Sequence, residues 1–170
     1  MTLHATIKRG FTLIELLIVI TIIGVLTALI TTNLQGARSR ARDTRRKSDL
    51  RAIEQSVRLY YNDAKRFPAN DSNFNIVGCN TLAAPSACSW GSAYAADDNT
   101  YMGSLPLDPS SSTATEITYK YVSSDDDEFL LVAQLENLSD SDIADSQSRC
   151  SGLYTGYAGD NTRDFVICAQ

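Results

Sequence analysis

The stretch FTLIELLIVITIIGVLTALITT, residues 11–32, decides the architecture of this chain. It holds fifteen apolar residues among twenty-two and one charge, at Glu15. At about 1.5 Å per residue, a helix of this length covers the roughly 30 Å hydrocarbon core of a bilayer. A soluble core helix rarely stays apolar around its whole circumference for so long. We therefore predict a transmembrane helix over residues 11–32.

The chain continues as a helix after Thr32, but its pattern becomes amphipathic. No proline interrupts residues 11–66, and the Phe67-Pro68 pair is the expected stop. We predict one helix of about 55 residues, with a protruding apolar half (11–32) and an amphipathic half (33–66). The apolar positions of the second half recur at helical spacing, at Leu50, Ile53, Val57, Tyr60 and Tyr61.

Charge separates the 170 residues into two unlike parts. Residues 1–66 hold twelve basic and five acidic residues, a formal +7, whereas residues 67–170 hold three basic and fifteen acidic residues, a formal −12. The sum of −5 therefore excludes a uniformly basic nucleic-acid-binding protein. The one histidine is His4, and no nucleophile elbow, phosphate-binding loop or HExxH motif is present, so we predict that the chain is not an enzyme.

A ten-residue leader, MTLHATIKRG, precedes the apolar stretch. The apolar run is too long for an ordinary secretory signal, and no small-residue cleavage site closes it. The string KRGFTLIE, residues 8–15, resembles the leader junction of type IV pilins and of type II secretion pseudopilins. The resemblance implies that prepilin peptidase cuts between Gly10 and Phe11, removing residues 1–10, and that Phe11 is then N-methylated.

Glu15 needs an explanation, because a carboxylate near the centre of a transmembrane helix costs about 2.5–3.5 kcal/mol. It could lie near the membrane interface or stay protonated. The resemblance implies instead that Glu15 pairs with the Phe11 amine of an adjacent subunit during filament assembly. Such a pair specifies register more than it adds stability.

The family resemblance also implies an α+β, pilin-like fold, in which the long N-terminal helix packs on a small antiparallel β-sheet head. It implies a structural filament subunit whose partners are other copies and other pilins, prepilin peptidase, the inner-membrane assembly platform and, before assembly, membrane lipid. The precursor would be a single-pass inner-membrane protein with its head outside the cytoplasm, and the product a cell-surface or periplasmic filament. Two alternatives stay open: a pseudopilin of a type II secretion or DNA-uptake system, and an anchored extracellular binding protein that does not polymerise.

The globular head of residues 67–170 contains three strand-like runs, at 117–122, 129–135 and 165–168. The polar segment 123–128 between the first two is typical of a hairpin turn. We predict a small antiparallel sheet that packs on the amphipathic half of the helix.

Four cysteines allow three disulfide pairings. Proximity in the sequence favours Cys79–Cys88 and Cys150–Cys168, and free thiols are the alternative. Oxidised cysteines are typical of an exported domain. In the family a disulfide is frequent near the C-terminal end, which agrees best with Cys150–Cys168.

The basic run RSRARDTRRKSDLR, residues 38–51, has three interpretations. It could be a solvated helix face near lipid headgroups, a contact with acidic surfaces of neighbouring subunits, or a DNA-binding segment. It lacks the interleaved aromatic residues of a single-strand platform, so we do not expect nucleic acid as a partner. The positive-inside rule alone would keep the C-terminal part in the cytoplasm, but the leader junction and the cysteines favour export.

The segment LPLDP, residues 105–109, resembles a Pro-x-Asp-Pro segment of major pseudopilins, some of which bind calcium in a nearby loop. Asp125, Asp126 and Asp127, together with Asp108, could supply hard oxygen ligands. The run lacks the spacing of a calcium loop, and clustered acids in turns are usually solvated. Calcium is therefore the one cofactor we consider, with Asp160, Asn161 and Asp164 as a weaker set.

Overall fold

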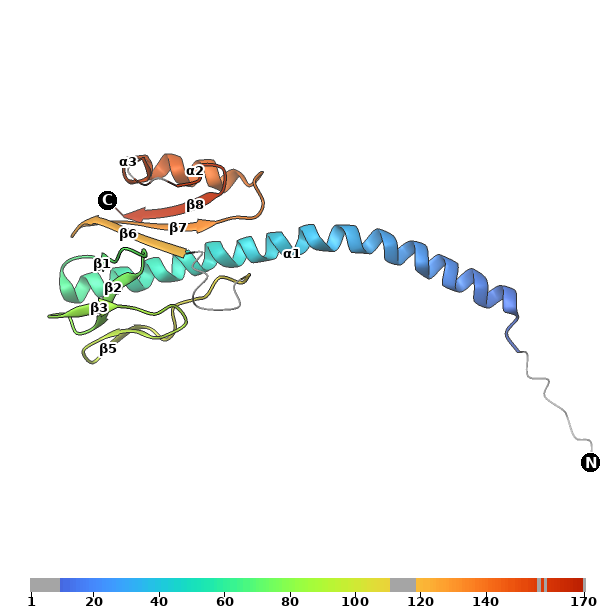
Figure 1. The fold of residues 1–170 in the computed structure, drawn as a ribbon, viewed down its shortest axis with the longest axis horizontal. Helices are drawn as coiled ribbons and strands as arrows, with labels where there is room; N and C mark the ends of the chain where they lie inside the picture. The colour runs from blue at the N-terminus through green and yellow to red at the C-terminus, as the bar shows by residue number, and fades with distance from the viewer. Residues whose placement is uncertain (1–9, 111–118, 156, 158, 170) are drawn as a thin grey trace, which may run out of the picture. The chain divides into compact units, whose positions relative to one another are not determined.

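The computed structural model describes residues 10–110, 119–155, 157 and 159–169, without the side chains of residues 29–33. The chain divides into two compact units, residues 1–38 and residues 39–170. One helix, α1 (Leu13–Ala64), contributes to both units (Figure 1). The long N-terminal helix predicted from the sequence is thereby confirmed. It begins two residues later and ends two residues earlier than the predicted range of 11–66.

In the first unit, α1 leaves its apolar side chains uncovered. The large hydrophobic side chains from Leu13 to Leu26 are all between 46% and 88% exposed. Among the residues whose side chains are described, no helix has the length and hydropathy needed to cross a membrane. The predicted transmembrane stretch of residues 11–32 runs into residues 29–33, whose side chains lie outside the described part.

In the second unit, the predicted apolar stripe of α1 forms the centre of the core. Leu50, Ile53 and Val57 are fully buried and Tyr60 is nearly so. The helix ends at Ala64, after which Lys65 takes a left-handed φ of 55° that breaks the helical backbone. Phe67 then turns back into the core, where its ring lies 4.7 Å from that of Phe129.

The first sheet consists of short strands, none of which was expected from the sequence. Its order is β1-β2-β4-β5, and β3 pairs with β2. One pairing, between β2 and β4, is parallel, so this sheet is mixed. The strands are β1 (Ala69–Asn70), β2 (Ile76–Asn80), β3 (Pro85–Ala87), β4 (Tyr94–Ala96) and β5 (Asn99–Met102).

The second sheet is the predicted antiparallel one, with the order β6-β7-β8. Its strands are β6 (Tyr119–Asp125), β7 (Glu128–Gln134) and β8 (Asp164–Ala169). The β6–β7 hairpin is tighter than expected, because both strands extend into the predicted turn and leave only Asp126 and Asp127 between them. The start of the first predicted run, residues 117 and 118, lies outside the described residues.

The second sheet is covered on both faces, which explains why β7 is almost continuously apolar. Phe129, Leu131 and Ala133 belong to the core shared with α1, whereas Leu130 and Val132 pack in a second cluster. The second cluster also contains Cys150 and Tyr154, and the helices α2 (Ser141–Arg149) and α3 (Ser151–Tyr154) lie over this face in Figure 1. These two helices were not predicted.

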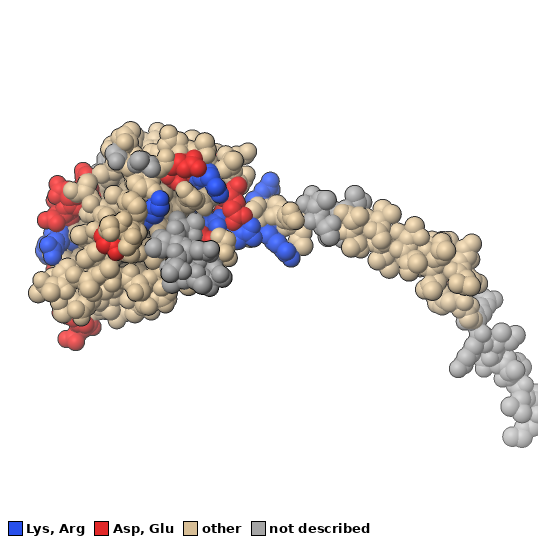
Figure 2. Space-filling model, viewed as in Figure 1, with Lys and Arg blue, Asp and Glu red and all other residues tan. Residues whose placement is uncertain are grey.

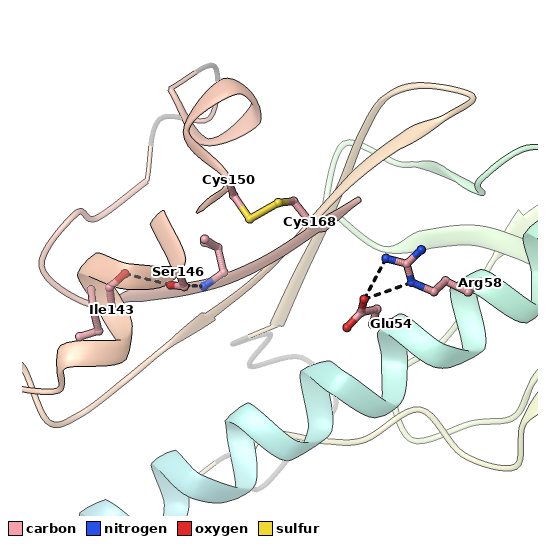
Figure 3. The surroundings of a disulfide bond; sticks show 7 residues. Glu54, Arg58, Ile143, Ser146, Cys150 and Cys168 are labelled. Carbon is pink, nitrogen blue, oxygen red and sulfur yellow. Dashed lines mark hydrogen bonds and ion pairs between the residues drawn. A yellow bond between two sulfur atoms is a disulfide. The ribbon is translucent and has the colours of Figure 1, made fainter. Parts of the chain in front are cut away.

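Both disulfides have the pairing that the sequence neighbours suggested, Cys79–Cys88 and Cys150–Cys168. The second one joins the end of α2 to β8, as Figure 3 shows. Close by, the Ser146 hydroxyl donates to the Ile143 carbonyl and accepts from the Val166 amide, so α2 and β8 are also joined by a buried hydrogen bond.

Candidate functional site

The predicted cleavage junction is fully accessible in the first unit. Gly10 is exposed, and Phe11 is 85% exposed. The helix begins two residues later, at Leu13, so Gly10 and Phe11 lie in extended chain before the helix. This geometry is compatible with the backbone access that a peptidase needs.

Glu15 closes the first turn of the helix on Thr12. Its carboxylate accepts hydrogen bonds from the Thr12 amide and hydroxyl, both at 2.9 Å, and the Glu15 amide donates to the Thr12 hydroxyl at 3.3 Å. This reciprocal arrangement is a capping box, which satisfies backbone donors that have no partner at a helix start. Its signal, T-x-x-E at residues 12–15, is present in the sequence, but no cap was predicted from it, and for Glu15 only an interfacial position, protonation or an intermolecular pairing was considered.

The basic run of residues 38–51 is not simply a solvated face. Arg46 is buried, and its guanidinium forms a two-bond fork with Asp108, with Nε–Oδ2 at 2.6 Å and Nη2–Oδ1 at 3.0 Å. The same group donates through Nη1 to Asp43 at 2.7 Å and to Glu136 at 2.9 Å. The solvated-face interpretation is therefore wrong for Arg46, because three carboxylates surround it.

Asp43 and Arg42 complete this arrangement, which we call the Arg46 cluster (Arg42, Asp43, Arg46, Asp108 and Glu136). The buried Asp43 carboxylate also accepts from the backbone amides of Glu136 and Asn137, at 2.9 Å each. Arg42 donates from Nε to Glu136 at 2.7 Å. The cluster thus attaches α1 both to the segment before β6 and to the turn after β7.

Electrostatics hold the cluster in its charged form. Burial opposes ionisation of Asp108, but hydrogen bonds from Arg46 and Ser110 outweigh it and lower the pKa of Asp108. Hydrogen bonds from Arg42, followed by those from Arg46, lower the pKa of Glu136 to about 2. Burial likewise opposes the charge on Arg46, yet the bonds to Asp108 and Asp43 raise its pKa.

A second ion pair lies one residue further along α1. Lys47 donates to Asp140 and Asp142 at 2.7 Å each, and Asp140 also caps the start of α2 through the Asp142 amide. Figure 2 shows acidic and basic side chains interleaved on the visible face of the head near this part of α1. Within the basic run, Arg42, Arg46 and Lys47 are thus neutralised by carboxylates of the head. The exposed arginines of the run take no part in these ion pairs.

The predicted calcium ligands are not brought together. Asp108 is 4% exposed and engaged by Arg46, whereas Asp127 accepts from the Tyr61 hydroxyl at 2.8 Å. The α1 residues that bind these two aspartates, Arg46 and Tyr61, are fifteen positions apart, or about 22 Å along the helix. Grouping Asp108 with Asp125, Asp126 and Asp127 was therefore wrong, because the buried aspartate is the counterion of an arginine.

No three His, Cys, Asp or Glu side chains among the described residues are placed to hold a metal ion. Calcium binding by Asp125, Asp126 and Asp127 alone stays a prediction. In the weaker set, the Asp164 carboxylate turns inward to accept from the Asp160 amide at 2.7 Å, and Asp160 itself accepts from Thr162. Burial raises the pKa of Asp164, as expected for an interior carboxyl without a cationic partner.

Known proteins agree with the junction and with the family resemblance of the sequence. Residues 6–31 match the family described as the prokaryotic N-terminal methylation motif. The type II secretion system core protein G of Klebsiella pneumoniae is 35% identical over 102 residues, which cover 60% of this chain and 69% of that protein. The core protein G of Aeromonas hydrophila is 33% identical over 102 residues, covering 60% of this chain and 67% of that protein. The chain belongs to the type IV pilin and type II secretion pseudopilin family.

Both branches of the pilin and pseudopilin family appear among its relatives. The type IV major pilin protein PilA of Myxococcus xanthus is 33% identical over 88 residues, covering 48% of this chain and 40% of that protein. No solved structure matches the chain. The relatives are a secretion-system core protein and a pilin rather than enzymes, which agrees with the prediction that this pilin-like chain performs no catalysis.

Proposed function

We propose that this chain is a structural subunit of a pilus-like filament and that it polymerises through its N-terminal helix. The observation that carries the proposal is the uncovered apolar surface of residues 13–26, whose large hydrophobic side chains are between 46% and 88% exposed. An apolar surface of this extent is normally covered by lipid or by protein. Membrane lipid would cover it before assembly, and the same segment of other subunits would cover it afterwards.

Processing makes this segment competent for assembly. Prepilin peptidase cuts after Gly10, and Phe11 becomes the methylated N-terminus. Loss of Lys8 and Arg9 changes the formal charge from −5 to −7. The new ammonium at Phe11 then provides an opposite charge for Glu15 of a neighbouring subunit, in competition with the Thr12 contacts that hold this carboxylate in the single chain.

A pseudopilus of a type II secretion system is the second candidate for the filament. It is favoured by the core protein G relatives, which match over two thirds of their own length. In either filament the partners are copies of this chain, other pilins and the inner-membrane assembly platform. The chain would be stored in the inner membrane with its head outside the cytoplasm. An anchored binding protein that never polymerises would have no need for the Gly10–Phe11 junction or for Glu15.

The test is co-expression of the full chain with a prepilin peptidase and an assembly platform. We expect a mature protein that begins at Phe11 and carries one added methyl group by mass spectrometry, and filaments in sheared material by electron microscopy. An N-terminus that stays at Met1 would contradict the proposal. Filaments that depend on secretion-system components rather than on pilus components would select the second candidate.

A further inference from the structure

Between Arg40 and Asn62 the exposed residues of α1 carry basic charge only, and the next exposed charge along the helix is Asp63. Ten residues from Arg40 to Asn62 are exposed; four of them are arginines and none is acidic. They recur at intervals of three and four positions, so they lie on the side of the helix opposite its buried stripe. We call the four arginines the arginine face (Arg40, Arg45, Arg51 and Arg58).

Little within the chain neutralises this face. Arg58 pairs with Glu54 at 3.0 Å, and Arg45 approaches Asp49 only at 3.8 Å with its side chain 66% exposed. Arg40 and Arg51 form no ion pair with any residue in the described part of the chain. The inward-facing Arg42, Arg46 and Lys47 are all engaged by head carboxylates, so Arg40 and Arg51 are the arginines of this face that lack an ion pair among the described residues.

A complementary acidic surface lies near the C-terminal end of α1. The acidic turn (Asp125, Asp126 and Asp127) is exposed at the tip of the β6–β7 hairpin. It is fixed beside the C-terminal end of α1, because the Phe67 amide donates to the Asp126 carbonyl at 2.6 Å and the Tyr61 hydroxyl donates to Asp127. The turn therefore has a defined position on the head.

Within one chain the acidic turn reaches only the Arg58 end of the arginine face, where Arg58 and Asp127 line one pocket, and it cannot reach Arg40 or Arg51. Tyr61, which marks the position of the turn, lies ten residues beyond Arg51 and twenty-one beyond Arg40, or about 15 Å and 32 Å along the helix. A second copy, displaced by such a distance along the helix axis, can place its turn against the arginine face while the two helices stay parallel. Because the two surfaces differ, the contact is head-to-tail and can repeat without closing, as a filament requires.

We propose that the arginine face of one copy binds the acidic turn of a second copy; this inference rests on the proposed function. Guanidinium groups suit carboxylates because they form paired hydrogen bonds. The contact also offsets the repulsion between heads of like charge, since residues 67–170 carry a formal −12. Anionic lipid is the less favoured partner, because the same negative head would be repelled by an anionic membrane.

Charge reversal in the full chain tests the contact. The first variant is Arg40→Glu with Arg51→Glu, the second is Asp125→Lys with Asp126→Lys, and the third combines all four changes. We expect each of the first two to reduce filament mass in sheared fractions about tenfold, because like charges then face each other across the contact. The combined variant restores opposite charges and should return to within about twofold of the unmodified chain.

Matched controls are Arg149→Glu and Asp145→Lys, which reverse exposed charges on α2 and should leave filament mass unchanged. Normal cleavage in every variant, measured by N-terminal mass, shows that all of them reach the peptidase. If the unmodified chain forms no filaments, the proposed function fails and the contact fails with it.

If the unmodified chain and both reversed variants assemble equally, or if the combined variant is no better than either one, only the contact is refuted. Vesicles of phosphatidylglycerol and of phosphatidylcholine identify the rival partner. Loss of phosphatidylglycerol binding by the arginine variant, with normal assembly of the aspartate variant, would assign the arginine face to lipid and overturn the proposal.

Discussion

Replacing Arg46 with methionine should strongly destabilise the head. Methionine keeps much of the buried volume but leaves Asp108 charged, with a side chain only 1% exposed and Ser110 as its remaining partner. Removing one member of a buried ion pair costs about 3–5 kcal/mol. For a domain of this size that corresponds to a fall in Tm of about 10–20 °C. Asp43 and Glu136 contribute less, since Asp43 keeps two backbone amides and Glu136 keeps Arg42.

The assay is thermal unfolding of the full chain in detergent, followed by circular dichroism. Arg45→Met is the matched control, because Arg45 lies on the same helix with its side chain 66% exposed and should change stability by under about 0.5 kcal/mol. The double variant Arg46→Met with Asp108→Leu removes both charges and should recover most of the lost stability, to within about 1–2 kcal/mol of the unmodified chain. The reasoning is refuted if Arg46→Met unfolds at the same temperature as Arg45→Met, or if the double variant is no more stable than the single one.

Three further predictions concern separate parts of the chain. Because the folded-state pKa of Glu136 is lowered from 4.5 to about 2, its contribution to stability is present above about pH 4.5 and is lost as the pH falls toward 2; Glu136→Gln should flatten that part of a Tm–pH profile. Replacing Cys150 and Cys168 with serine opens a connection of 18 residues and should cost about 3 kcal/mol in chemical denaturation, whereas an unchanged midpoint would show that the bond adds nothing. Glu15→Ala should leave cleavage intact but abolish filaments, whereas Thr12→Ala, which removes only the cap, should still assemble; equal loss in both variants would assign Glu15 a purely local role.

The elements with strong local signals were predictable from the sequence. The apolar run and the absence of proline indicated the helix, and the paired apolar segments around 123–128 indicated the β6–β7 hairpin. The first sheet was missed because β1, β3 and β4 have only two or three residues each, too few for an alternating pattern to register. The helix α2 was missed because it buries only Ile143 and Ser146, so its apolar stripe is almost absent from the sequence.

Sequence signals for the site exist only where the residues involved are close in sequence. Gly10, Phe11 and Glu15 form a contiguous string, and a T-x-x-E pattern was present for the capping box. Arg46 and Asp108, by contrast, are 62 residues apart, and neither carries a local sign of the other. Asp108 was grouped with the acidic turn because of its residue type and the resemblance of residues 105–109 to a pseudopilin segment, although the fold gives it a cation already present in the chain.

The Arg46 cluster has a mechanical consequence for a subunit that is held by its helix. A pull along α1 reaches the head through residues 42–47, which are bonded to the segment before β6, to the turn after β7 and, through Lys47, to the start of α2. We expect these three attachments to share the load, so that the head does not peel one strand at a time. A head built in this way transmits tension to its surroundings as a single body.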